Sequence, residues 1–155
     1  MRRLQKFLFN LSASDRLLLI KTVLLLAAIR LGLLLLPLQT LRRVLAKLTP
    51  TTTNLRQIDP ASASKISWSV IVASQCIPGA KCLAQSLTTQ VLLLRCGYPT
   101  DLRIGIVRDK GGLSAHAWLE SFGQVVFGGE GNMHLYISVP LEEVDSNVTG
   151  LIPFA

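Results

Sequence analysis

The order of the structural elements along the sequence predicts an α+β domain. Segments in which apolar residues recur at helical spacing come first, at 13–48 and 81–96. Short alternating segments separated by glycine-containing turns follow after Pro99. Hydrophobic residues make up 50% of the 155 positions, which is enough to build a core. Helices followed by strands are typical of the α+β class.

The first predicted helix covers residues 13–36. Ser12 or Ser14 suits the N-cap, because a serine hydroxyl can accept a hydrogen bond from an N–H group of the first turn. Asp15 suits the positive end of the helix dipole. Pro37 ends or kinks this helix, because proline has no N–H group and clashes with the preceding turn.

An apolar run at residues 17–36 within this helix is long enough to cross a bilayer. Lys21 and Arg30 interrupt it and fall on opposite faces of the helix, where each would be costly in hydrocarbon. We therefore expect a buried helix packed on the rest of the protein. Contact with a membrane is the alternative.

The next segments are a second helix and a linker. Residues 38–48 predict an amphipathic helix whose basic face is expected to be solvated. Residues 51–64 are polar, contain Pro60 and predict a linker. The pattern of residues 65–75 fits either a helix or a strand.

A further helix is predicted after the turn at Pro78 and Gly79. Its apolar positions begin after Lys81, and Gly97 suits the residue just beyond its C-terminus, where a left-handed conformation is common. Cys82 therefore lies in the first turn of a buried helix. The strands of an antiparallel meander follow at 102–108, 113–120 and 124–127, with turns at 109–112 and 121–123, and residues 134–139 can add one more strand.

Positive charge is concentrated in the N-terminal part. Residues 1–50 hold nine Lys or Arg and one acid, whereas residues 51–155 hold seven Lys or Arg and eight Asp or Glu. This asymmetry suggests a polyanion, a membrane surface or an acidic protein as a partner for the first part. Aromatic residues are sparse and no nucleic-acid motif is present, so we expect no nucleic-acid binding.

The spacing of the three cysteines matches no zinc site and predicts free thiols in a reducing, cytoplasmic compartment. A thiol acts as a nucleophile only as the thiolate, which the N-terminus of a helix favours. Cys82 has that predicted position, with Lys81 beside it. Cys96 lies at a helix C-terminus and Cys76 lies in the approach to a turn, so both are poorer candidates.

The stretch SAHAWLE places His116 in the middle of a predicted strand. Alternation puts it on one face with Ser114, Trp118 and Glu120, opposite Ala115, Ala117 and Leu119. Such a face suits the wall of a cleft or a solvated surface, so His116 is either a catalytic base or a structural histidine. His134, the other histidine, is expected to be a surface or packing residue.

These motifs, taken in order, resemble the transglutaminase-like cysteine protease of lasso peptide biosynthesis, the B protein. The resemblance covers roughly residues 75–140 and rests on KCLAQSLTTQVLLLRCGYPTDLRIGIV followed by AHAWLES. It implies a papain-like or transglutaminase-like catalytic domain at 65–155, with a helix at 65–75, after an N-terminal helical segment at 1–50. It also implies that Cys82 is the nucleophile and His116 the base.

The third catalytic residue departs from the family. Many relatives carry an Asp twelve residues beyond the histidine, where this chain has Gly128. If residue 116 pairs with residue 128 across the hairpin, Glu130 lies diagonally opposite His116, close enough to orient it. The alternative is that a backbone carbonyl or water holds the histidine. Glu120 is too far along the strand to do so.

Two further residues are weaker candidates for the site. Gln75 precedes Cys82 as the oxyanion-hole glutamine precedes the cysteine of papain-like enzymes. Trp118 is expected to be a packing residue or a wall of the substrate groove. We assign the chain no metal, cofactor or nucleotide.

The resemblance implies removal of the leader peptide from a ribosomally made lasso precursor. Full-length relatives carry a leader-binding domain with strands, whereas residues 1–50 predict helices. We therefore expect the stand-alone peptidase of a split system, acting with a separate leader-recognition protein and an ATP-dependent cyclase. Two alternatives stay open: a membrane-associated scaffold with a degenerate protease fold, and another transglutaminase-like acyl transferase or hydrolase.

Overall fold

The computed structural model describes residues 12–49, 60–109, 112–129 and 136–139. Within these residues the helices are α2 (Ala13–Leu35), α3 (Leu38–Leu48), α4 (Pro60–Ser74) and α5 (Cys82–Arg95). The strands are β1 (Asp101–Asp109), β2 (Gly112–Ser121), β3 (Gln124–Phe127) and β4 (Ile137–Val139). Helices precede strands, so the predicted α+β class is confirmed.

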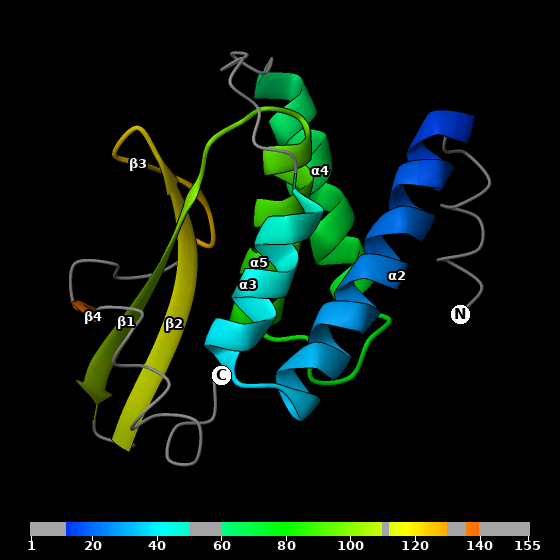
Figure 1. The fold of residues 1–155 in the computed structure, drawn as a ribbon. Helices are drawn as coiled ribbons and strands as arrows, with labels where there is room; N and C mark the ends of the chain where they lie inside the picture. The colour runs from blue at the N-terminus through cyan, green and yellow to red at the C-terminus, as the bar shows by residue number, and fades with distance from the viewer. Residues whose placement is uncertain (1–11, 50–59, 110–111, 130–135, 140–155) are drawn as a thin grey trace.

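The strands form one antiparallel sheet with the order β3-β2-β1-β4. The sheet lies to one side of the helices, and α5 lies between it and the pair formed by α2 and α4 (Figure 1). A buried cluster joins residues from all four helices to inward-facing residues of the sheet such as Ala117 and Leu119. The predicted meander is confirmed as β1, β2 and β3, and β4 extends it on the far side of β1.

The register of the β2–β3 hairpin differs from the expected one. We expected a turn at 121–123 with residue 120 opposite 124. Instead Ser121 pairs with Gln124, and the turn is only the two residues Phe122 and Gly123, both with positive φ. The pairing then shifts by one residue at a bulge, from Glu120–Val125 to Leu119–Phe127. The predicted pairing of residue 116 with residue 128 is therefore wrong, because the turn is one residue shorter and the strand is bulged.

The start of α2 is held as the sequence predicts. Ser12 is its N-cap, and the Ser12 hydroxyl accepts a hydrogen bond from the Asp15 N–H group. The same hydroxyl donates to the Asp15 carboxylate at 2.7 Å, and Lys65 of α4 pairs with this carboxylate at 3.3 Å. The hydrogen bond from Ser12 and the contact with Lys65 lower the pKa of Asp15.

Helix α2 has one buried face and one exposed face. Leu26 and Ile29 are buried against the neighbouring helices. On the same face the Thr22 hydroxyl lies 3.0 Å from the Ser69 hydroxyl of α4, and both residues are fully buried. The expectation of a helix packed on the protein is met by this face, while the opposite face is exposed. By length and composition alone, α2 could also cross a membrane.

Arg30, a charge within the apolar run, packs against the loop that leads into α5. A Cβ atom added at Gly79 would lie 2.7 Å from Arg30 Nη2, so the guanidinium rests directly on that glycine. Gly79 has a φ of 73°, as expected of the Pro78–Gly79 turn. Arg30 therefore supports the turn that precedes Cys82.

The start of α4 and the end of α5 can also be compared with their predicted positions. Helix α4 begins at Pro60, so residues 60–64, which we assigned to the linker, are helical. Helix α5 ends at Arg95, with Gly97 beyond its C-cap at a φ of 84°, as predicted. The remainder of the expected linker lies outside the described residues.

Candidate active site

Cys82 is the first residue of α5. The helix's first internal hydrogen bond runs from the Gln85 N–H group to the Lys81 carbonyl, so the N–H groups of residues 82–84 lie ahead of the hydrogen-bonded ladder. Among the described residues, no side chain caps this end. Cys82 is half-buried, and its thiol lies at the positive end of the helix dipole. This position is the one that the sequence predicts.

A hydrogen bond joins α5, which carries Cys82, to β2, which carries His116. The Ser86 hydroxyl, fully buried one turn along α5, donates to the carbonyl of Ala117 at 3.0 Å. Leu83 and Leu87 of α5 are buried in the same core. The helix that carries Cys82 is thus anchored to the strand residue next to His116.

His116 is half-buried and lies opposite Gly105 in the register of β1 and β2. Its Nε2 atom lies 2.7 Å from the carbonyl oxygen of Gly128, which can only accept. Nε2 therefore carries the proton of a neutral ring, and Nδ1 carries the lone pair. The ring is stacked against Trp118 with centroids 6.3 Å apart and tilted against Tyr136 at 5.5 Å.

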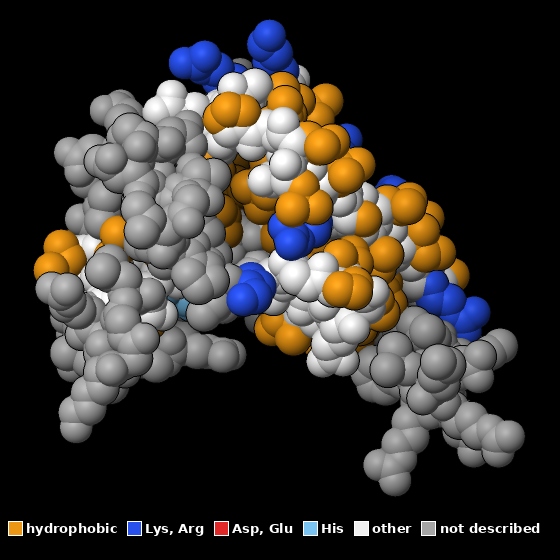
Figure 2. Space-filling view, turned by 90° about the horizontal axis from the view of Figure 1, so that it is seen from below, with side chains coloured by type: hydrophobic (Ala, Val, Ile, Leu, Met, Phe, Trp, Pro, Cys, Tyr) orange, Lys and Arg blue, Asp and Glu red, His pale blue; other side chains and the backbone are white. Residues whose placement is uncertain are grey.

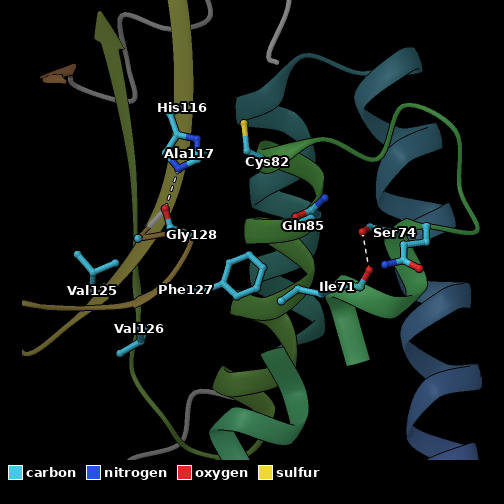
Figure 3. A pocket seen from close by; sticks show the side chains of 12 residues that line it. Ile71, Ser74, Cys82, Gln85, His116, Ala117, Val125, Val126, Phe127 and Gly128 are labelled. Carbon is cyan, nitrogen blue, oxygen red and sulfur yellow. Dashed lines mark hydrogen bonds between the residues drawn. The ribbon is translucent and has the colours of Figure 1, made fainter. Parts of the chain in front are cut away.

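One pocket of about 540 Å³ brings the candidate residues together. Cys82, His116 and Gln75 all line it, and Figure 3 shows Cys82 at the start of α5 facing His116 across its mouth. Gln75 is exposed in the turn after α4. The tertiary structure thus gathers three of the five predicted residues, from three different elements.

The other two predicted residues are Trp118 and Glu130. Trp118 does not line this pocket; it is buried at 6% exposure, and its indole N–H donates to the Glu120 carboxylate at 2.9 Å. The same carboxylate pairs with Arg103 at 3.0 Å. Trp118 is therefore a packing residue that supports the His116 ring, which was one of its two expected roles. Glu130 lies outside the described residues.

Gly128 is the site residue that the sequence analysis did not assign. We considered a backbone carbonyl as the partner of His116 without saying which one. Gly128 stands where the resemblance led us to look for an Asp, and its carbonyl makes the contact with His116 (Figure 3). A backbone acceptor has no side-chain signature, so composition and spacing could not reveal it.

Only glycine fits at position 128. Its φ is 75°, and an added Cβ would lie 3.0 Å from the Ala117 carbonyl oxygen and 3.2 Å from Trp118 Cα. We expect Gly128→Ala to move the carbonyl that holds His116 and to lower kcat by about 10- to 100-fold, because small misplacements of catalytic groups have effects of this size. Steady-state kinetics measures this change.

Gly123→Ala is the matched control for that substitution. Gly123 has a similar φ of 77°, but an added Cβ there meets nothing within 4 Å. Both variants should lose about 1–2 kcal/mol of stability from the left-handed conformation, and only Gly128→Ala should lose activity. Equal kinetic losses in the two variants would mean that the Gly128 carbonyl does not position His116.

A second, mostly apolar pocket of about 510 Å³ continues from the first. It shares Ile71 and Val126 with the first pocket, and Trp68 and Tyr98 line its far part. The two pockets therefore adjoin each other next to α4 and β3. An extended chain could lie along the two pockets with one of its carbonyls at Cys82.

The other described groups do not add a metal or a second reactive site. Cys76 and Cys96 are exposed free thiols outside both pockets. Among the described residues, no group of three or more His, Cys, Asp or Glu side chains could hold a metal ion. The chemistry that the described site can perform is therefore that of a thiol beside an imidazole.

Comparison with known families identifies the superfamily of the chain. The family description "Transglutaminase-like superfamily" matches residues 23–139, about three quarters of the chain. No curated protein and no solved structure matches significantly. The match spans α2 to β4 and so includes both Cys82 and His116. Catalysis by a cysteine is common in this superfamily, and the chain belongs to it.

Proposed function

We propose that this protein is a cysteine peptidase that removes the leader peptide from a lasso peptide precursor. It acts with a separate leader-recognition protein and an ATP-dependent cyclase in the cytoplasm. The observation that carries the proposal is the pocket in which Cys82, at the N-terminus of α5, faces His116, whose Nε2 is held by the Gly128 carbonyl.

Cleavage follows the usual course of a thiol peptidase. His116 Nδ1 accepts the Cys82 proton while Sγ attacks the carbonyl carbon at the leader–core junction. The tetrahedral intermediate collapses as His116 returns the proton to the leaving amine, and the C–N bond breaks. Water then hydrolyses the thioester with His116 as base. The products are the leader carboxylate and the free amine of the core.

The oxyanion formed in these steps needs donors close to Cys82. The N–H groups of the first turn of α5 point out of the helix at this end, and Gln75 lies in the same pocket with an amide that can donate. Donors of this kind typically contribute 10²–10³-fold to the rate of acyl transfer. This arrangement supports an acyl substrate.

The presence of two adjoining pockets supports a peptide rather than a small acyl compound as the substrate, because a peptide can contact both. The two pockets join through Ile71 and Val126, and each is larger than 500 Å³. Ile71 is 46% exposed and Val125 is 45% exposed in these pockets, so apolar contacts are available to a bound chain. A peptide that fills both pockets places residues on one side of the scissile bond against Trp68 and Tyr98.

The proposal of a split system rests on the sequence resemblance and on the packing of the N-terminal helices. Helices α2 and α3 pack into the same core as α4 and α5, and the family match begins within α2. This packing supports a role of both helices in the fold of the domain that carries Cys82 and His116. In the proposed split system a separate protein presents the leader, and the protease alone is slow.

Mass spectrometry of a candidate precursor, incubated with this protein in the presence and absence of a leader-binding protein, tests the proposal. We expect a single cut at the leader–core junction that is faster with the leader-binding protein. In water labelled with heavy oxygen, the new leader carboxylate should carry one label, because water completes the reaction. Full activity without the partner would contradict the split arrangement.

The same experiment separates the alternatives. A leader fragment joined to an added amine, with no label from water, would identify an acyl transferase. An intact precursor, with a folded protein and a bound partner, would favour a scaffold that has kept the protease fold.

A further inference from the structure

An apolar face on α2 has no covering element among the described residues. It consists of six side chains that are 53–71% exposed: Leu17, Ile20, Leu24, Leu31, Leu34 and Leu35. We call these residues the leucine face. The first five are spaced by three, four or seven residues and Leu35 follows Leu34 directly, which places all six on one side of the helix, opposite the buried residues Thr22, Leu26 and Ile29.

The buried face of α2 keeps the helix in the domain. Leu26 is fully buried, and Thr22 contacts Ser69 of α4 through buried hydroxyls. Moving α2 across a bilayer would open this core, break the contact between the two hydroxyls and place Thr22 and Lys21 in hydrocarbon. A helix fixed in this way can meet a membrane only along its side, with its axis in the plane of the surface.

The charges carried by helices α2 and α3 are almost all positive. Helices α2 and α3 carry six Lys or Arg and one acid, Asp15, which is paired with Lys65. Figure 2 shows hydrophobic side chains gathered over this part of the molecule with Lys and Arg among them, and no Asp or Glu is visible there among the described residues. Apolar side chains together with cations suit a lipid bilayer, which has an apolar interior and anionic headgroups.

The composition of the face argues against a protein occupant. A second copy of the chain would bring the same cations against each other. The leucine face contains no aromatic residue, whereas the centres of protein interfaces are enriched in aromatic residues and leucine is under-represented among their energetic hot spots. We infer that the leucine face binds the surface of an anionic lipid bilayer, with α2 lying in the plane of the interface.

Co-sedimentation of the full chain with vesicles tests this inference independently of peptidase activity. The vesicles are phosphatidylcholine alone or an equal mixture with phosphatidylglycerol, at low and high salt. We expect binding to the anionic vesicles that weakens with salt. The double variant Leu24→Gln/Leu31→Gln keeps good helix formers and should lower the partition coefficient on the order of 100-fold.

Phe122→Ser is the matched control, because Phe122 is 79% exposed on the β2–β3 turn, outside the leucine face. It should bind the anionic vesicles as the unchanged protein does. Circular dichroism establishes that each variant is folded before it is compared.

Four results of the vesicle experiments would overturn the inference. They are no binding to either vesicle, equal binding to both, binding that the double variant retains, and resistance to extraction by carbonate, which would indicate a spanning helix. A dimer in light scattering without lipid, lost in the double variant, would show that a second copy covers the face and would also overturn it.

Discussion

Cys82→Ala is expected to lower the rate of precursor cleavage by a factor on the order of 10³ or more, because removal of a nucleophile leaves only binding and oxyanion stabilisation. Cys82 lines the pocket at the N-terminus of α5, whereas the other two cysteines are exposed elsewhere. The measurement is the initial rate of cleavage followed by mass spectrometry, with the leader-binding protein present.

Cys76→Ala and Cys96→Ala are the controls for this experiment. Both remove an exposed thiol of the same kind and should leave the rate within about twofold, since surface substitutions have small effects. With the unchanged protein, a brief incubation should also trap the leader as a thioester on Cys82. Equal cleavage by Cys82→Ala and the unchanged protein would remove Cys82 from the mechanism.

His116→Ala should produce the second largest loss, about 10²–10⁴-fold, as expected for removal of a general acid–base group. His116 is held by its contact with the Gly128 carbonyl and by the ring of Trp118, so the loss of the imidazole leaves a defined space. We expect added imidazole to restore part of the activity, because it can enter that space and accept the thiol proton.

His134→Ala removes the only other histidine and serves as the control. It should retain the rate of the unchanged protein and should not respond to imidazole. If His116→Ala loses activity but imidazole has no effect, while circular dichroism shows a lower stability, His116 would be structural. Retained activity in His116→Ala would exclude the proposed Cys–His mechanism.

Local features of the sequence were sufficient to place most helices and strands. The Ser12 cap, Pro37 and Gly97 act on the residues next to them, and each helix boundary that depends on them lies where it was predicted or within one residue. The linker boundary was less accurate, because Pro60 can begin a helix as well as belong to a loop.

The register of the β2–β3 hairpin could not be predicted in the same way. It depends on the left-handed conformation of both Phe122 and Gly123 and on a bulge between residues 119 and 120. Phenylalanine gives no signal for positive φ, and a bulge has no fixed sequence pattern. A shift of one residue in this hairpin changes which group of the chain after β3 contacts His116.

The sequence by itself determined the fold class, the position of Cys82 at a helix N-terminus and the position of His116 within a strand. These depend on spacing and capping, which act over a few residues. Only the tertiary structure decided that both line one pocket, that the Gly128 carbonyl holds His116, and that α2 buries one face and exposes the other. The physical reason is that contacts between distant segments depend on strand register and helix packing. The sequence also does not show whether a given backbone carbonyl accepts a hydrogen bond or whether a given leucine is buried or exposed.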